Sequence, residues 1–321
     1  MKPGNNGHAS KRSAWNAVRF DEGQDEAARA PLPPTSIRRL LRQLGFRPRK
    51  KLGQNFLFDE DILDRIVDAA EVAATDQVLE VGPGLGTLTA RLAERAAHVV
   101  AVELDPQLAQ IVANELRDRG NVEVVNQDVL KFAPGDRFPA HGYKMVGNLP
   151  YYVTSPILRH FLENPCQPSL MVLMLQREVA ERITARPGDM SLLSVSVQLY
   201  GDPHIVRLVD RGAFYPQPQV DSAIVRIDVY PKPVLDVEPA LFFTLVAAGF
   251  AQRRKQLHNA LAQRFWMRPG LPTQLLHEAG IDPTRRAETL SLEEWHRLFQ
   301  VFVREGVLKS NPPPGGAPPT P

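Results

Sequence analysis

The residues best suited to chemistry form the turn Asn148-Leu149-Pro150-Tyr151, which follows a short apolar run at 144–146. Pro150 has a fixed φ and no N–H, and it disfavours a helical conformation at Leu149, so the turn is stiff and exposes carbonyl oxygens. The Asn148 side-chain oxygen and a neighbouring carbonyl can both accept from one exocyclic amino group, while Tyr151 can stack on the base that carries it. An adenine amino nitrogen is a poor nucleophile because its lone pair is delocalised into the ring. Two acceptors favour a pyramidal nitrogen, so the turn predicts methyl transfer to such an amine by positioning and electrostatics.

A glycine-rich turn and two acids form a second group. The turn has the sequence GPGLG at 82–86 and follows the apolar run VLEV at 78–81. Glycines there allow a tight turn and let a ligand approach the backbone closely. Glu103 ends the next predicted strand, where it can accept hydrogen bonds from ribose hydroxyls, and Asp128 follows the third strand, where it can hold the amine of an adenine. The group predicts a site for a nucleoside cofactor.

Two nucleoside cofactors fit this pattern. The dinucleotide fingerprint GxGxxG would require its third glycine at position 87, but Thr87 stands there and the motif here is GxGxG. Glu80 directly precedes the turn and would repel a pyrophosphate, whereas it suits a cationic sulfonium or amino group. The acids favour S-adenosylmethionine. A nicotinamide oxidoreductase remains an alternative, although it leaves the turn at 148–151 without a role.

Helical and extended patterns alternate along the chain and would position these groups. Strands are predicted at 77–81, 99–103, 122–125, 144–146, 170–175, 194–200 and 223–229, and helices at 59–70, 86–95, 106–119, 156–162 and 177–185. This alternation predicts an α/β fold with an open parallel sheet and helices on both faces. Beyond the YPKP sequence at 230–233 the pattern is helical only, with helices at 241–261, 273–279 and 292–303.

The domain organisation follows from composition. Residues 1–35 show no periodic pattern of apolar residues and are predicted to form a disordered extension. Residues 309–321 are rich in proline and glycine and are predicted to form a disordered tail. Between them we predict a cofactor-binding α/β domain at 36–230 and a small all-helical domain at 234–308.

Composition excludes several protein classes. The chain has 321 residues, a formal net charge of +2 and a single cysteine, Cys166, so an intrachain disulfide or a CxxC metal site is impossible. The eight histidines show no paired spacing, and no apolar run approaches the length of a membrane span. We therefore expect a cytoplasmic protein with no metal and no membrane association.

Two basic clusters are candidates for contact with an anionic partner. Residues 36–51 contain seven bases and no acid, with an apolar helical stripe at Ile37, Leu40, Leu41 and Leu44. A second cluster lies in the helical region. Each cluster alone also fits a solvated helix face, but two clusters flanking a base-recognition site favour RNA. The predicted RNA-binding residues are Arg49, Lys50, Lys51, Arg253, Arg254 and Lys255. Trp266 and Trp295 are predicted to pack within the helices.

Several motifs together resemble one known family. RKKLGQNFL, VLEVGPGLG, AVELD, NQDV, GNLPYYVTSPIL, FYPQPQVDSAIVR and FAQRRKQLHNAL occur in order between about 46 and 305. They are similar to the ribosomal small-subunit RNA adenine dimethyltransferases. The resemblance implies a Rossmann-like class I methyltransferase sheet, S-adenosylmethionine as cofactor and a monomer. The implied substrate is N6 of two adjacent adenosines in a hairpin loop near the 3′ end of small-subunit RNA, within the 30S pre-subunit late in assembly.

The resemblance also assigns the cofactor site. Asn55 and Leu57 would close over the methionine end, Gly82 would contact the cofactor through its backbone, Glu103 would hold the ribose and Asp128 the adenine. The implied cofactor-binding residues are Asn55, Leu57, Gly82, Gly84, Glu103, Asp128, Val129 and Asn148.

At the target base, Asn148 would bridge the cofactor and the amine, Tyr151 would stack on one face of the base and Phe214 would lie on the other. The implied catalytic residues are Asn148, Leu149, Pro150, Tyr151 and Phe214.

One segment departs from the family pattern, and two alternatives stay open. Residues 186–193 shorten a stretch where the family usually carries a Lys and a Tyr-Gly, so RNA contacts of a loop beside the target pocket can differ. The alternatives are a large-subunit RNA adenine methyltransferase of the antibiotic-resistance type, and a ribosome-assembly factor whose main contribution is docking.

Overall fold

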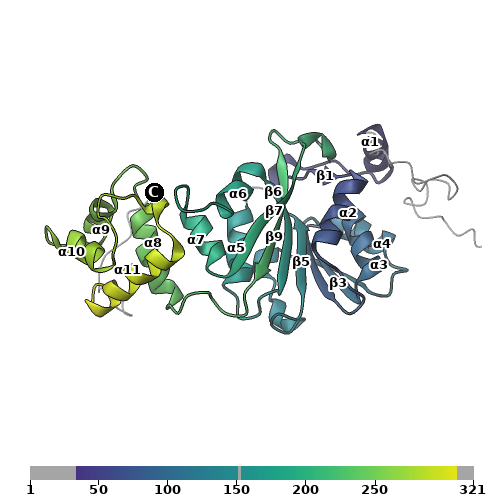
Figure 1. The fold of residues 1–321 in the computed structure, drawn as a ribbon. Coiled ribbons are helices and arrows are strands. Elements are labelled where there is room, and N and C mark those ends of the chain that lie inside the picture. Colours follow the sequence, from purple (N-terminus) through teal and green to yellow (C-terminus); the bar gives the residue numbers. More distant parts are fainter. Residues whose placement is uncertain (1–33, 151–152, 309–321) are drawn as a thin grey trace, which may run out of the picture.

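A seven-stranded sheet forms the centre of the part of the chain before the C-terminal helices (Figure 1). The structure is a computed structural model that describes residues 34–150 and 153–308. The strand order is β4-β3-β2-β5-β6-β9-β7. The bounds of these strands are β2 Gln77–Val81, β3 His98–Glu103, β4 Val122–Asn126, β5 Lys144–Asn148, β6 Leu170–Gln176, β7 Gly201–Val209 and β9 Ser222–Val229.

The sheet is mixed, which corrects the expectation of a parallel sheet throughout. The strands from β4 to β6 are parallel, but β9 runs antiparallel to both β6 and β7. The connection from Val209 to Ser222 contains no crossover helix that could return the chain to a parallel start. The order nevertheless reverses beside β2, between strands β3 and β5, which is where open α/β sheets bind ligands.

The strand predicted at 194–200 is wrong, because this segment is helix α7 (Leu192–Gln198). Ser191 and Ser194 form a capping box that starts the helix, and the alternation of Ser and Val imitates a strand. The strand that the prediction missed is β7, where Pro203 and exposed polar side chains interrupt the apolar pattern. Its edge position tolerates both.

Helices cover both faces of the sheet. Alternate residues of β6 belong to two apolar clusters, with Val172 and Met174 facing one and Leu173 and Leu175 the other. The first cluster includes apolar residues of α2 and α3, and the second includes residues of α5, α6 and α7. The helices of this domain are α2 Glu60–Ala69, α3 Thr87–Arg95, α4 Pro106–Glu115, α5 Thr154–Leu162, α6 Arg177–Ile183 and α7. Short 3-10 helices occur at Lys50–Leu52, Val129–Lys131, Pro134–Asp136, Arg211–Ala213 and Ala287–Thr289.

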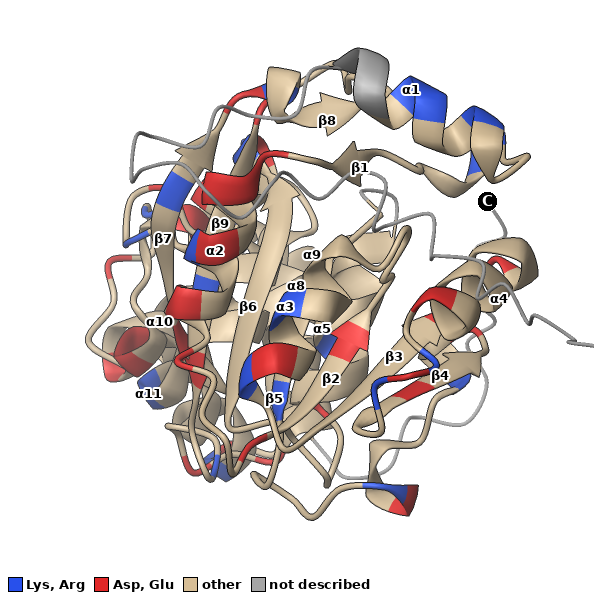
Figure 2. Ribbon diagram, turned by 90° about the vertical axis from the view of Figure 1, so that its right-hand side faces the viewer, with Lys and Arg blue, Asp and Glu red and all other residues tan. Residues whose placement is uncertain are grey.

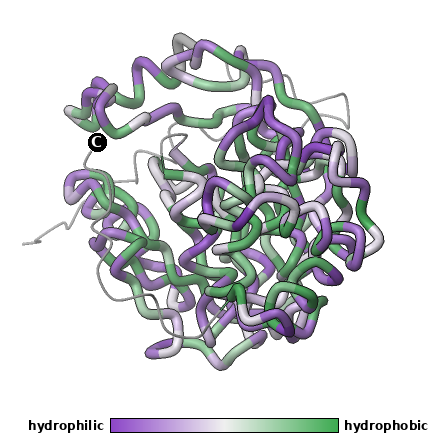
Figure 3. The backbone as a smooth tube through the Cα atoms, turned by 90° about the vertical axis from the view of Figure 1, so that its left-hand side faces the viewer, coloured by the Kyte–Doolittle hydropathy of each residue, from purple (hydrophilic) through white to green (hydrophobic). Residues whose placement is uncertain are grey.

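Four helices follow the sheet and lie at the opposite end of the molecule from α1 (Pro34–Gln43), as Figure 1 shows. They are α8 Pro239–Phe250, α9 Leu257–Phe265, α10 Leu271–Glu278 and α11 Leu292–Arg304. The single helix predicted at 241–261 is therefore two helices separated by a turn. Figure 3 views these helices from their outer side, where hydrophilic and hydrophobic stretches alternate along the tube. Their inner sides pack around Trp295, which is fully buried, and the same apolar cluster continues to the sheet.

The predicted amphipathic stripe at the N-terminal arm is confirmed. Ile37, Leu40 and Leu41 of α1 are buried, while Arg38, Arg39 and other bases of the arm are exposed. The helix begins at Pro34, two residues before the predicted boundary. The remaining expectations for the tails concern residues 1–33 and 309–321, which lie outside the described residues. Among the described helices, none has the length and apolar character needed to cross a membrane.

Candidate active site

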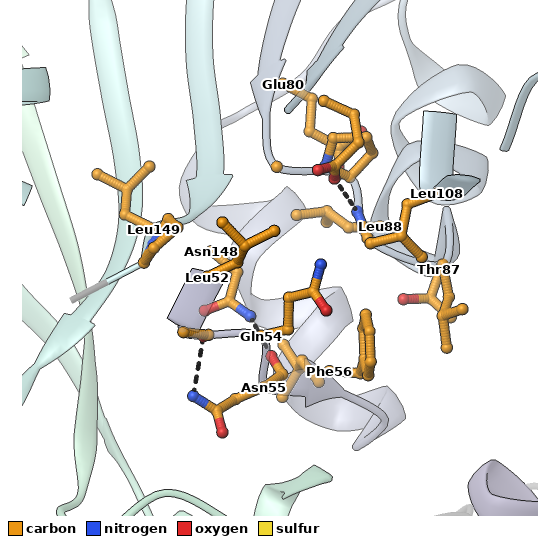
Figure 4. A pocket seen from close by; sticks show the side chains of 18 of the residues that line it. Leu52, Gln54, Asn55, Phe56, Glu80, Thr87, Leu88, Leu108, Asn148 and Leu149 are labelled. Carbon is orange, nitrogen blue, oxygen red and sulfur yellow. Dashed lines mark hydrogen bonds between the residues drawn. The ribbon is translucent and has the colours of Figure 1, made fainter. Parts of the chain in front are cut away.

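The glycine turn after β2 requires glycine at three positions. Gly82, Gly84 and Gly86 have φ values of 71°, 59° and 82°, in the left-handed region that other residues avoid. A side chain at position 84 would also place its Cβ 3.2 Å from the Phe56 ring. The turn therefore presents bare backbone to a cleft, and the side chains around that cleft are seen in Figure 4.

The segment that precedes β1 (Phe56–Leu57) crosses the cleft and is held by Asp105. Gln54 donates to the Asp105 carboxylate over 3.0 Å, and an Arg49 guanidinium nitrogen lies 3.4 Å from the same oxygen. Asp105 is 1% exposed and also caps α4 by accepting from Gln107 N–H. Sequence reasoning missed Asp105, although an Asp before a proline at a helix start is typical of a cap. Its role in anchoring the arm has no local signal, because Gln54 lies 51 residues away in the sequence.

Asn148 is the last residue of β5 and points into the cleft (Figure 4). Its side-chain amide donates to the carbonyl of Asn55 over 3.0 Å, which leaves Oδ1 as the acceptor, and none of the described residues donates to that oxygen. The Leu149 side chain is 1% exposed, and its N–H donates to Met174 O of β6. The buried leucine and this bond to β6 fix the first half of the turn to the sheet. Tyr151 lies outside the described residues.

Glu103 ends β3 and is tied to the glycine turn. Its carboxylate accepts from the N–H of Gly84 over 3.2 Å and from the N–H of Asp105 over 2.9 Å. Burial raises the pKa of this carboxyl above its usual range, and the two N–H donors oppose that increase. Glu103 thus holds the turn and also lines the cleft, where a ribose hydroxyl can reach it.

Glu80 is the unusual group of the site. It is 1% exposed, it lines the cleft, and its Oε2 has no hydrogen-bond partner among the described residues. Burial, with a smaller contribution from the nearby charge of Glu103, raises the pKa of Glu80 to about 8. The carboxyl is therefore protonated at neutral pH until a cation or another donor reaches it. An unsatisfied buried carboxyl of this kind costs folding free energy, which indicates a functional role.

The structure brings most of the predicted cofactor residues to one cleft. Those that line it are Asn55, Leu57, Gly82, Gly84, Glu103 and Asn148. Asp128 and Val129 are not among the lining residues. Asp128 accepts from the N–H of Leu130, and the neighbouring Gln127 donates its N–H to Glu103 O. Asp128 and Val129 therefore lie just beyond the end of β4, next to the end of β3. Their contact with a cofactor stays a prediction.

Phe214 has a different environment from the one its predicted role needs. It lies in β8 (Phe214–Tyr215), which pairs with β1 so that Phe214 is opposite Leu57. Its ring is 2% exposed and belongs to the apolar cluster that contains Ile62 and Leu63. Stacking on a base would require the ring to become exposed, and this role also stays a prediction.

The predicted RNA-binding residues fall on two separate surfaces. Arg49 and Lys51 are exposed beside the cleft, close to α1, whose bases are blue in Figure 2; the side chain of Lys50 is not described. Arg253, Arg254 and Lys255 are exposed in the turn between α8 and α9, among the C-terminal helices. No cluster of three or more His, Cys, Asp or Glu suitable for a metal occurs among the described residues.

The shortened segment at 186–193 does not lie beside the cleft. The N–H groups of Gly188 and Met190 both donate to Glu288 O in the C-terminal region. The segment therefore contacts the C-terminal helical region, and none of its residues lines the cleft.

Comparison with known proteins agrees with this geometry. Residues 45–304 match the model of the family "Ribosomal RNA adenine dimethylase". A ribosomal RNA small subunit methyltransferase A from Dehalococcoides mccartyi is 46% identical over 286 residues, covering 85% of this chain and 97% of the relative. The protein of the same name from Alkaliphilus metalliredigens is 44% identical over 273 residues, covering 83% and 95%.

Two solved structures share the fold over most of the chain. A dimethyladenosine transferase from Plasmodium falciparum has a TM-score of 0.68 at 26% identity, covering 78% of this chain and 98% of its own. A 23S rRNA methyltransferase, ErmE, has a TM-score of 0.63 at 33% identity, covering 77% and 99%. The Rossmann-like methyltransferase fold predicted from the sequence is thus confirmed.

Proposed function

The chain belongs to the ribosomal RNA adenine dimethylase family and is an rRNA adenine dimethyltransferase, and from this we propose its cofactor and substrate. The cofactor is S-adenosylmethionine. The substrate is N6 of two adjacent adenosines in a hairpin loop near the 3′ end of small-subunit RNA, modified late in assembly of the subunit. Small-subunit RNA is preferred because the curated relatives with 44–46% identity carry that name, whereas ErmE is 33% identical.

One contact carries the proposal. A Cβ built on Gly82 would lie only 3.6 Å from the backbone oxygen of Asn148. The glycine turn that would hold a nucleoside cofactor and the Asn-Leu-Pro turn that would accept an amine therefore lie side by side, at the ends of the paired strands β2 and β5. Positioning two reactants in one site supplies much of the catalysis in a reaction that needs no covalent intermediate.

The residues of the cleft fit S-adenosylmethionine. Glu80 lines the cleft and its Oε2 would be available to a cation, and the glycine turn leaves room for the ligand against the backbone. Glu103 would accept from the ribose, and Asn55 and Leu57 would cover the methionine end. When bound, the sulfonium supplies the methyl group. A pyrophosphate would oppose ionisation of Glu80, whereas a cationic ligand would favour it, which argues against a dinucleotide.

Asn148 would act on the target amine. Its Nδ2 is held by Asn55 O, so the side chain is oriented before substrate arrives, and its Oδ1 can accept one amine hydrogen. The backbone oxygen next in the turn can accept the other. Holding both hydrogens directs the nitrogen lone pair toward the methyl donor, and each preorganised hydrogen bond of this kind is worth about 10²- to 10³-fold in rate. Tyr151 and Phe214 would contact the faces of the base.

The exposed cations beside the cleft would bind the RNA backbone. Arg39, Arg42 and Arg47 make no ion pair with any described residue, and they lie on α1 and on the segment that leads from it to the cleft. Arg49 lies on this surface and also pairs with Asp105. RNA binding to Arg49 would therefore alter the ion pair that holds the segment covering the cofactor.

The test is mass-spectrometric mapping of methylated adenosines in ribosomal RNA from a strain lacking this protein and from the same strain carrying the native chain or Asn148→Ala. We expect N6-dimethyladenosine at two adjacent positions in small-subunit RNA only with the native chain. Label in large-subunit RNA instead would overturn the substrate assignment. If Asn148→Ala restores subunit maturation without methylation, docking rather than methyl transfer is the main contribution.

A further inference from the structure

Trp266 lies on the surface of the C-terminal helices. Its residue is 92% exposed, so the prediction that it packs within the helices is wrong, whereas the same prediction for Trp295 is confirmed. Trp266 ends α9 with φ of 51°, in the left-handed region, while its neighbours Phe265 and Met267 pack against the apolar cluster. The left-handed conformation of Trp266 thus turns the backbone so that the indole side chain faces the solvent.

The surroundings of Trp266 are cationic. Between Glu238 and Glu278 the sequence contains no Asp or Glu, although the whole chain has nearly equal numbers of acids and bases. The cations of this stretch are all exposed, and none of them forms an ion pair with a described residue. They are Arg253, Arg254, Lys255, Arg264 and Arg268. Unpaired cations without nearby acids produce a locally positive electrostatic potential, even though the net charge of the whole chain is only +2.

Two hydrogen bonds join the α8–α9 turn, which carries three of these cations, to α9. The side chains of Gln252 and Lys255 both donate to Gln263 Oε1, over 2.6 Å and 3.2 Å. Gln263 lies in the last turn of α9, the helix that ends at Trp266. We call Arg253, Arg254, Lys255, Arg264, Trp266 and Arg268 the Trp266 surface.

The composition of this surface favours RNA over a membrane. Insertion into a lipid interface needs a broad apolar face, but the exposed neighbours of Trp266 are charged or polar, including Gln263 and Arg264. A single aromatic platform surrounded by cations is typical of sites where unpaired bases stack and phosphates pair with basic side chains.

We propose that the Trp266 surface binds a single-stranded segment of RNA, with one unpaired base stacked on the indole and the flanking phosphates paired with the surrounding cations. The proposal rests on the proposed function and extends it. α9 lies in the C-terminal helices, away from β1 and α3 beside the cleft (Figure 1), so this segment is a part of the RNA other than the methylated loop. It would hold the substrate by a second, independent contact.

The test is binding of the full chain, without cofactor, to a single-stranded oligoadenylate and to its duplex with oligouridylate. We expect Trp266→Ala to weaken binding of the single strand about tenfold or more and to leave the salt dependence unchanged, since a stacked base carries no ion release. Trp266→Phe should restore much of the affinity. Val303→Ala, which removes another exposed apolar side chain of the C-terminal helices, is the matched control and should bind like the native chain.

A double variant, Arg253→Gln with Arg254→Gln, should reduce the salt dependence as well as the affinity, because it removes phosphate contacts. The fluorescence difference between the native chain and Trp266→Phe should be quenched by the single strand at the same concentration. Unchanged binding by Trp266→Ala, or an equal loss toward the duplex, overturns the proposal. Stronger binding to anionic lipid vesicles than to oligoadenylate overturns it as well. Because no methyl transfer is measured, failure here leaves the proposed activity standing, and an inactive enzyme can still pass this test.

Discussion

The side-chain amide of Asn148 donates to the backbone oxygen of Asn55 across a sequence separation of 93 residues. This bond joins the end of a central strand to the arm that crosses the cleft. The arm is also held by Asp105, so the proposed acceptor of the target amine and the proposed cover of the cofactor are positioned by one network. A change in the position of the arm would therefore change the orientation of Asn148.

Asn148→Ala should abolish detectable methylation while leaving the fold intact. The change removes the acceptor Oδ1 and the bond to Asn55, and loss of one preorganised group costs about 10²- to 10³-fold in rate. Transfer of labelled methyl to small subunits from a strain lacking the enzyme measures this. Asn114→Ala, at an exposed position of α4, is the control and should be fully active. An Asn148→Ala enzyme with near-native rate would contradict the role.

Glu80 should make the stability of the cofactor-free protein fall as pH rises. Its pKa in the folded chain is about 8 and its ordinary value is 4.5, so between these values the unfolded chain has released the proton and the folded chain has not. The contribution of Glu80 to the free energy of unfolding is largest below pH 4.5. It decreases as the pH rises from 4.5 to about 8 and is constant above that. Denaturant unfolding at several pH values measures it, and Glu80→Gln should flatten the dependence across that range.

Cofactor binding should release a proton through the same group. A cationic ligand favours ionised Glu80, so affinity for S-adenosylmethionine should increase as the pH approaches about 8 and then level off. Calorimetry in buffers of different ionisation enthalpy counts the released protons. Glu80→Gln should release fewer and bind more weakly. Equal proton release by both proteins would show that Glu80 is ionised before the cofactor arrives.

A comparison of Gly84→Ala with Gly45→Ala distinguishes the cost of an unfavourable backbone conformation from the effect of an added methyl group in the cleft. Both glycines have positive φ, at 59° and 64°, so both variants should lose about 1–2 kcal/mol of stability. Only at position 84 does the added Cβ meet a neighbour, the Phe56 ring at 3.2 Å, and nothing lies within 4 Å at position 45. We expect only Gly84→Ala to weaken cofactor binding, measured by calorimetry. Equal affinities would mean that the turn is not part of the cofactor site.

Gly249→Ala should destabilise the C-terminal helices. A Cβ at this position would lie 2.5 Å from Trp295 Cη2, and the buried indole cannot move away without disturbing the cluster. Overpacking of this kind costs about 1–3 kcal/mol. Thermal unfolding measures the loss, with Gly120→Ala as the control because nothing lies within 4 Å of the added atom. A melting temperature like that of the control would contradict the packing described for α8 and α11.

Much of the site could be predicted from the sequence because it depends on local patterns. The strand at 77–81 was predicted with the bounds that β2 has, and the glycines that follow it are in the conformations for which glycine is needed. Strand ends in an α/β sheet meet at one edge, so Glu103 and Asn148 could be assigned to the same cleft before the structure was known. Asp59, a residue type that favours helix starts, stands at the beginning of the helix predicted at 59–70, and its side chain accepts from Ile62 N–H.

The sequence alone determined which residues form the chemical turns, because φ preferences, caps and apolar periodicity act between close neighbours in the chain. Only the tertiary structure decided which side chains are covered. Phe214 and Trp266 have similar aromatic character, yet packing of β8 against β1 buries the first and the left-handed end of α9 exposes the second. The bond from Asn148 to Asn55 and the antiparallel edge of the sheet were likewise decided by distant segments. Their contacts depend on how whole elements pack, which no local pattern specifies.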